Sequence, residues 1–195
     1  MKRICVFCGS SFGSSPAYLE AARSFGPALA SQNLGLVYGG AAIGLMGALA
    51  DSAMEAGVEV IGVIPQSLVD REIAHAGLSD LRIVSTMHER KAAMADLSDG
   101  FAVLPGGAGT LEEFFEAWTW GQLGLHDKPC GLLNVENYFE GLLSMVDEMV
   151  HREFIAERFA GTLIVEETAG QLLTAFLNYR PPPHKFDGTF PPPRP

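Results

Sequence analysis

Short apolar runs recur along the chain and alternate with longer segments in which apolar residues return every three or four positions. The runs are continuous rather than interleaved with polar residues, which is typical of parallel strands covered on both faces. The longer segments have the spacing of amphipathic helices. The pattern predicts strands over residues 4–8, 35–38, 58–64, 81–84, 101–104, 130–133 and 163–165. It predicts helices over residues 16–32, 45–56, 87–97, 111–123, 138–153 and 169–179.

Strand–helix alternation of this kind predicts an α/β fold, a Rossmann-like doubly wound parallel sheet with helices on both faces. We expect one catalytic domain over residues 1–180, followed by a proline-rich, weakly ordered tail over residues 181–195. In such a sheet, ligands bind beyond the carboxyl ends of the strands. The loops that follow the strands are therefore where chemistry is expected.

Composition narrows the possible partners. The 195 residues are 48% hydrophobic and carry a formal net charge of −10, which argues against binding to nucleic acid. The apolar runs are too short to cross a bilayer, and the N-terminal one stops at Gly9, so we expect a cytoplasmic protein with no membrane partner. Cys5 and Cys8 are spaced as C-x-x-C, but strand residues three apart point to opposite faces. With only Cys130 besides, we interpret them as buried thiols and expect no metal site.

Three of the loops after predicted strands are rich in glycine or serine. They cover residues 8–13, with Gly9 and Ser10, residues 38–47, with Gly39 and Gly40, and residues 104–110. Glycine lets backbone N–H groups approach a ligand closely, and a following helix N-terminus favours an anion. None of the loops matches the P-loop motif or the dinucleotide fingerprint. Three such loops at one sheet edge predict a phosphate-binding site of another kind.

The third of these loops runs into a predicted helix at Thr110. Thr110 and Glu113 have the spacing of a capping box, with Thr110 as the N-cap. That interpretation gives both residues a structural role and leaves Glu112 unassigned. A carboxylate beside a phosphate loop suits general-base work or the stabilisation of a developing cation. Glu112 is therefore the first candidate for chemistry at this loop.

A second cluster of charge stands at the start of the predicted helix 87–97. Thr86 and Glu89 again fit a capping box. Arg90 and Lys91 follow in the early turns, where the helix dipole disfavours cations. A solvated charged face is the plain alternative. Adjacent cations beside a strand end in an acidic protein instead favour contact with a phosphate or a leaving group.

These motifs together resemble the LOG (Lonely guy) family of cytokinin riboside 5′-monophosphate phosphoribohydrolases, formerly labelled lysine decarboxylases. Residues 105–113 resemble the family's P-G-G-x-G-T-x-x-E signature, residues 87–91 its second motif, and residues 38–40 with 44–47 its third. The resemblance covers about residues 3–179. One departure is Ala108, where many relatives have a bulkier residue such as tyrosine, and it leaves the preferred base open.

The resemblance implies roles for individual residues. Arg90 and Lys91 would contact the nucleotide, Glu112 or Glu113 would act at the ribose, and Glu72 would line the base pocket, with Thr119 a further contact. The candidate catalytic residues are Arg90, Glu112 and Glu113. The candidate substrate-binding residues are Gly9, Ser10, Gly39, Gly40, Glu72, Met87, Arg90, Lys91, Gly106, Gly107, Ala108, Gly109, Thr110, Glu112 and Thr119.

The expected activity is hydrolysis of the N-glycosidic bond of nucleoside 5′-monophosphates, either AMP or its N6-modified forms, without a cofactor. The resemblance also implies a homodimer with sites near the subunit interface. The alternative is a non-catalytic nucleotide-binding module with the same loops. Lysine decarboxylation would need a pyridoxal phosphate lysine, and of Lys2, Lys91, Lys128 and Lys185 only Lys91 is near the expected site.

Overall fold

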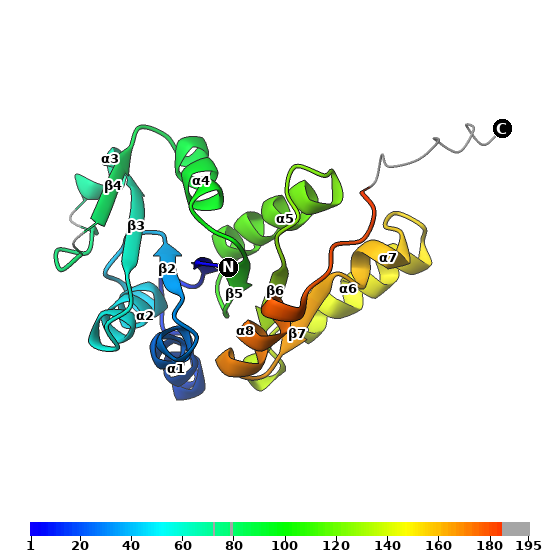
Figure 1. Ribbon diagram of the computed structural model, residues 1–195, viewed down its shortest axis with the longest axis horizontal. Coiled ribbons are helices and arrows are strands. Elements are labelled where there is room, and N and C mark those ends of the chain that lie inside the picture. The colour runs from blue at the N-terminus through cyan, green and yellow to red at the C-terminus, as the bar shows by residue number, and fades with distance from the viewer. Residues whose placement is uncertain (72, 79, 185–195) are drawn as a thin grey trace.

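The computed structural model, which describes residues 1–71, 73–78 and 80–184, contains a seven-stranded sheet with helices on both faces (Figure 1). The strand order is β4-β3-β2-β1-β5-β6-β7, and every neighbouring pair is parallel. The predicted fold class and all the predicted strands are thus confirmed. The strands are β1 (Arg3–Phe7), β2 (Gly35–Tyr38), β3 (Val60–Pro65), β4 (Asp80–Val84), β5 (Phe101–Val103), β6 (Cys130–Leu133) and β7 (Leu163–Glu166).

The six predicted helices are also present, with shifts at their ends. The structure has two further helices of four residues each, α3 and α7. The sequence did not predict them because so short a segment has no readable periodicity. The predicted helix 138–153 begins later, after a 3₁₀ turn in which Glu136 and Asn137 have positive φ. The helices are α1 (Pro16–Ser31), α2 (Gly44–Glu55), α3 (Gln66–Val69), α4 (Met87–Asp96), α5 (Ala108–Gln122), η1 (Val135–Asn137), α6 (Glu140–His151), α7 (Glu157–Ala160) and α8 (Ala169–Asn178).

Two apolar cores lie on opposite faces of the sheet, because successive strand residues point to opposite sides. Along β1, Ile4 and Val6 pack with α1, α2 and α8, whereas Cys5 and Phe7 pack with α4, α5 and α6. Cys8 belongs to the first of these cores and Cys5 to the second. All three cysteines are buried and free, so the prediction of buried thiols on opposite faces is confirmed.

The central strand determines where a site can form. β1 pairs with β2 on one side and with β5 on the other, so the chain changes direction along the sheet at this point. The loops after β1 and β5 therefore leave toward different layers and open a crevice between them. β1 ends at Phe7 and β5 at Val103, and each is followed at once by one of the glycine-rich loops. The fold thus places the predicted phosphate loops side by side.

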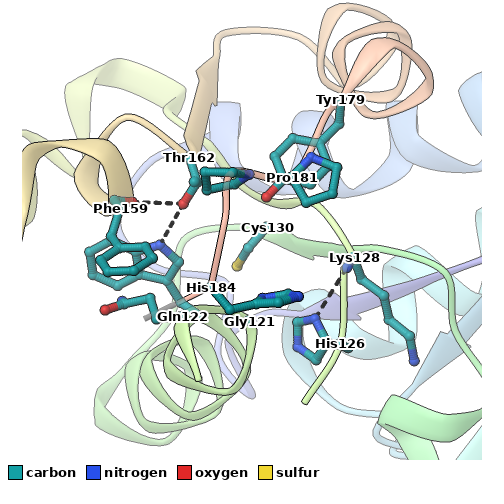
Figure 2. A pocket seen from close by; sticks show the side chains of 12 residues that line it. Gly121, Gln122, His126, Lys128, Cys130, Phe159, Thr162, Tyr179, Pro181 and His184 are labelled. Carbon is teal, nitrogen blue, oxygen red and sulfur yellow. Dashed lines mark hydrogen bonds between the residues drawn. The ribbon is translucent and has the colours of Figure 1, made fainter. Parts of the chain in front are cut away.

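The beginning of the predicted tail packs against the far end of α5. Tyr179, Pro181 and His184 help to close a cavity of about 20 Å³ around Cys130 (Figure 2), which is room for about one water molecule. His184 Nε2 lies 3.3 Å from Asp127 Oδ1. This end of the sheet is remote from the glycine-rich loops, so the cavity belongs to the packing of residues 179–184. Residues 185–195 of the predicted tail lie outside the described residues.

Helices α1 and α2 approach closely at Gly26, where a Cβ would lie 2.5 Å from the backbone carbonyl carbon of Ser52. We expect Gly26→Ala to lower the free energy of unfolding by about 1–2 kcal/mol, because overpacking outweighs the gain of about 1 kcal/mol in helix propensity. The matched control is Gly141→Ala in α6, where a Cβ meets nothing within 4 Å. Urea denaturation measures both. A Gly26→Ala protein as stable as Gly141→Ala would contradict the close approach.

Candidate functional site

The glycine-rich loops meet at the carboxyl edge of the sheet. The backbone N–H of Gly9 donates to the carbonyl of Pro105 at 3.0 Å, and the N–H of Leu45 donates to the carbonyl of Gly9 at 3.1 Å. The loop after β1 therefore bridges the loop after β5 and the start of α2. This confirms the expectation that loops far apart in sequence share one edge of the sheet.

The glycines of the loop after β5 serve two purposes. A Cβ on Gly106 would collide with the side chain of Thr110, so Gly106 is required by packing. A Cβ on Gly107 or Gly109 would meet no protein atom within 4 Å. α5 begins at Ala108, and the N–H groups of its first turn have no intrahelical partner. Gly107 and Gly109 thus keep the approach to these donors open, as an anion site requires.

The predicted capping box of Thr110 and Glu113 is wrong. α5 begins three residues before the predicted start, its N-cap is Gly107, and no side chain caps it. Thr110 is instead buried against Gly106, and Glu113 reaches across to α4. Of the other predicted capping box, the N-cap is confirmed, because the hydroxyl of Thr86 accepts from the N–H of Glu89 at 3.1 Å. The Glu89 carboxylate accepts from the N–H of Ser85 at 2.8 Å and not from that of Thr86.

Arg90 and Glu113 form a buried ion pair between α4 and α5. Arg90 Nη1 lies 3.4 Å from Glu113 Oε1, and the side chains are only 10% and 12% exposed. The guanidinium is fixed from behind, because its Nε donates to the carbonyl of Val63 at 3.1 Å and its Nη2 donates to that of Gly39 at 3.3 Å. A Cβ on Gly39 would collide with this guanidinium, so Gly39 is required for Arg90 to dock.

Burial is the largest influence on the pKa of Glu113. It raises the pKa of Glu113 to about 7, against the opposing charge of Arg90. A carboxylate with such a pKa is a stronger base than an exposed one. Because the pKa is higher in the folded than in the unfolded chain, protonated Glu113 favours folding below the ordinary pKa. That contribution is lost as the pH rises through about 7.

Glu112 and Lys91 lie apart from this pair. Lys91 Nζ contacts Glu112 and lies 3.0 Å from Glu116 Oε2. Burial opposes protonation of Lys91, but the hydrogen bonds to both carboxylates prevail and raise its pKa. Glu112 is 57% exposed. The two adjacent cations therefore have different partners. Arg90 points inward to Glu113, and Lys91 pairs with Glu112 and Glu116 on α5.

A cleft of about 360 Å³ opens over the Arg90–Glu113 pair and the first turn of α5. Cys8 and Met46 also line it, although the sequence offered no sign of the first and only a motif position for the second. Gly9, Gly39, Gly40 and Gly106 are not among the lining residues. Gly9 bonds to the loop after β5, Gly39 leaves room for Arg90, and Gly106 leaves room for Thr110. The lining residues are Cys8, Ser10, Met46, Met87, Arg90, Gly107, Ala108, Gly109, Thr110, Glu112 and Glu113.

Two further predicted contacts, Lys91 and Thr119, do not line the cleft. Lys91 is paired with acids of α5 as described. Thr119 is exposed on α5, seven residues and about two turns after Glu112. Glu72 lies outside the described residues. Among the described residues no cluster of three or more potential metal ligands is present. Within residues 1–71, 73–78 and 80–184, no helix has the length and apolar character to span a membrane.

Comparison with known proteins finds similar sequences over most of the chain. A family model described as "Possible lysine decarboxylase" matches residues 46–176. A cytokinin riboside 5′-monophosphate phosphoribohydrolase of Arabidopsis thaliana is 48% identical over 180 residues, covering 92% of this chain and 84% of that protein. A probable cytokinin riboside 5′-monophosphate phosphoribohydrolase of Oryza sativa subsp. japonica is 47% identical, covering 92% and 72%.

Solved structures share the fold at lower identity. The Moco carrier protein from Chlamydomonas reinhardtii aligns with a TM-score of 0.68 at 21% identity, covering 91% of this chain and 96% of that one. The molybdenum cofactor binding protein from Rippkaea orientalis aligns with a TM-score of 0.67 at 20% identity, covering 91% and 97%. At this identity the likeness concerns the fold alone.

The open space above Gly109 leads to a test of the phosphate site. We expect Gly109→Ala to leave the melting temperature nearly unchanged but to weaken binding of AMP by about tenfold or more, since the new methyl group blocks backbone N–H donors to the phosphate. Gly141→Ala is the control, because its Cβ is equally free of contacts but far from the cleft. Calorimetric titration measures the affinities. Equal affinity of the two variants for AMP would contradict a phosphate site at this loop.

Proposed function

This chain belongs to the LOG family of phosphoribohydrolases, and from that membership we propose that its cleft hydrolyses the N-glycosidic bond of nucleoside 5′-monophosphates. The substrates we assign are AMP and its N6-modified cytokinin forms, the class named in the relatives. The products are the free base and ribose 5-phosphate. The observation that carries the proposal is the buried Arg90–Glu113 pair beside the open first turn of α5.

The proposed mechanism follows the layout of the cleft. The N–H groups at the start of α5, with Ser10 opposite, hold the 5′-phosphate. The ribose then lies over Glu113, one turn further along the helix. N-glycosidic bonds break through an oxocarbenium-like transition state. The Glu113 carboxylate stabilises the developing positive charge and accepts a proton from the attacking water, while the bond from C1′ to the base nitrogen breaks. The base departs with the bonding electron pair and takes a proton from solvent water, and Glu113 then gives its proton back to solvent, which restores the carboxylate.

Arg90 holds Glu113 in position and contributes a fixed positive charge toward the departing base. Its Nη1 also lies 4.0 Å from the sulfur of Met87, on the wall of the cleft. Met46 forms another part of the wall. Thioether side chains pack well against flat aromatic rings, so this wall suits a purine base. Of the two catalytic candidates on α5, the geometry favours Glu113 over the exposed Glu112.

Pyridoxal phosphate chemistry, which the description of the family model raises, does not fit the cleft. That cofactor is held through a Schiff base with a lysine. No lysine lines the cleft in the described part of the chain. Lys91 is occupied by Glu112 and Glu116. Lys128 donates to the carbonyl of Ala95 at 2.7 Å, away from the glycine-rich loops.

We also propose a homodimer that completes the cleft. Met87 lines the cleft and is 45% exposed, and Ile83, on the neighbouring β4, is 52% exposed. Large apolar side chains at that exposure are suited to cover by a partner. Thr119 would reach substrate only across such an interface. A cytoplasmic location is part of the same proposal, supported by the free state of Cys5, Cys8 and Cys130.

The test of the function is product release with matched variants of adjacent carboxylates. The wild-type protein should convert AMP to adenine and ribose 5-phosphate, detected by chromatography. Glu113→Gln should lower kcat by about a hundredfold or more, because it removes a proton acceptor and a negative charge at C1′. Glu112→Gln should change kcat less than about fivefold, because an exposed ion pair contributes at most about 1 kcal/mol.

Each outcome of this test is decisive. Tight AMP binding without adenine release by the wild-type protein would overturn the proposed hydrolysis. Release that is lost in Glu112→Gln and retained in Glu113→Gln would exchange the roles of the two carboxylates. Glu112→Gln should keep the wild-type melting temperature at pH 8. Glu113→Gln should lower it, because the buried Arg90 guanidinium loses its charged partner, so release is compared at a temperature at which thermal melting shows both variants folded.

A further inference from the structure

A second hollow, of about 280 Å³, adjoins the glycine loop on the side away from Glu113. It opens between the start of α1 and Tyr138, whereas the cleft opens between α4 and α5. The two share Ser10 and Gly107. We call it the aromatic hollow. Its lining residues are Gly9, Ser10, Ser11, Phe12, Gly13, Tyr18, Leu45, Pro105, Gly106, Gly107 and Tyr138.

The aromatic hollow has a chemistry unlike that of the cleft. Three aromatic rings and Leu45 line it, and none of its lining residues is charged. The rings of Tyr18 and Tyr138 meet edge to face, with centroids 5.7 Å apart. Phe12 is 52% exposed, so its ring is accessible to a ligand in the hollow. Such walls favour a flat, uncharged ring over a phosphate or a carboxylate.

The backbone holds these rings against the phosphate loop. A Cβ on Gly13, which has a φ of +74°, would lie 2.7 Å from the ring of Tyr18. Glu136 and Asn137 both have positive φ, which is costly for residues with a side chain. They deliver Tyr138, whose hydroxyl donates to the carbonyl of Gly106 at 2.6 Å. The hollow and the phosphate loop are thus one connected structure.

We propose that the aromatic hollow binds a ring carried on the 5′-phosphate, so that the protein accepts nucleoside 5′-phosphodiesters as well as monophosphates. The inference rests on the proposed function, which puts the phosphate at Gly107–Thr110 and the ribose over Glu113. The remaining phosphate oxygens then face the shared edge at Ser10 and Gly107. A ring esterified to one of them enters the hollow. Hydrolysis at C1′ releases the base and leaves the phosphodiester bond intact.

The experiment compares three ligands that differ only at the phosphate. They are AMP, adenosine 5′-(phenyl phosphate) and adenosine 5′-(methyl phosphate), the last being a diester of the same charge without a ring. Calorimetry gives the dissociation constants and chromatography gives adenine release. The phenyl ester should bind about tenfold tighter than the methyl ester, at the lower end of what stacking on aromatic side chains contributes.

Two variants locate the effect. Phe12→Ala should bring the ratio of phenyl to methyl affinity close to one and leave AMP affinity unchanged, because Phe12 lines the hollow and not the cleft. Tyr138→Phe keeps its ring but loses the hydrogen bond to Gly106. It should weaken all three ligands by a similar factor. Because Phe12 is exposed, Phe12→Ala should keep the wild-type fold. Thermal melting of the variant checks this separately from the binding measurements.

The failures are distinguishable. Equal binding of the two esters, or a phenyl preference that survives Phe12→Ala, would overturn the aromatic subsite even if AMP is hydrolysed. A phenyl preference lost in Phe12→Ala, with no adenine released from any ligand, would sustain the subsite and overturn the proposed hydrolysis. Absence of binding by all three ligands would overturn both.

Discussion

The buried pair of Arg90 and Glu113 is the interaction on which the rest of the site depends. It joins α4 to α5 across the carboxyl edge of the sheet, with both side chains almost fully covered. Leaving either charge without its partner in such a place costs several kcal/mol, so each residue requires the other. The carbonyls of Val63 and Gly39 hold the guanidinium from β3 and the loop after β2. Three segments distant in sequence, β3, the loop after β2 and α5, thus converge on the Arg90 guanidinium.

The glycine loop complements this pair. At Gly106 and Gly39 a side chain would collide with protein atoms. At Gly107 and Gly109 a Cβ would meet no protein atom within 4 Å. The first kind of glycine builds the site and the second leaves it open. Charge and space are arranged together, with orphan N–H donors for an anion at the helix start and a basic carboxylate one turn beyond. Such an arrangement suits a phosphorylated sugar whose anomeric carbon becomes positive.

Much of this was predictable from the sequence. Continuous apolar runs determined the strands, and the glycine loops after them determined the edge at which the site forms. Capping was harder, since Thr110 and Glu113 have the right spacing for a box but the helix begins earlier, at Ala108. A side chain that caps and one that crosses to another helix have the same local sequence. Only the position of Arg90, brought in by tertiary packing, distinguishes them.

The sequence could not predict that Arg90 and Lys91 have different partners, nor that the aromatic hollow forms. Both depend on tertiary packing. Adjacent residues on a helix point about 100° apart, so their destinations depend on what packs around them. Phe12 and Tyr138 stand in loops without periodicity. Their convergence with Tyr18 depends on the positive φ at Glu136 and Asn137. Sequence patterns report the regular elements well, and the loops between them poorly.

The central claim, that burial makes Glu113 the basic carboxylate of the site, is tested most directly by titrating its side chain. Carbon-13 NMR of the glutamate carboxyls, with Glu113→Gln used to assign the signal, gives the midpoint. We expect a midpoint near pH 7 for Glu113. A midpoint near the ordinary glutamate value of about 4.3 would contradict it.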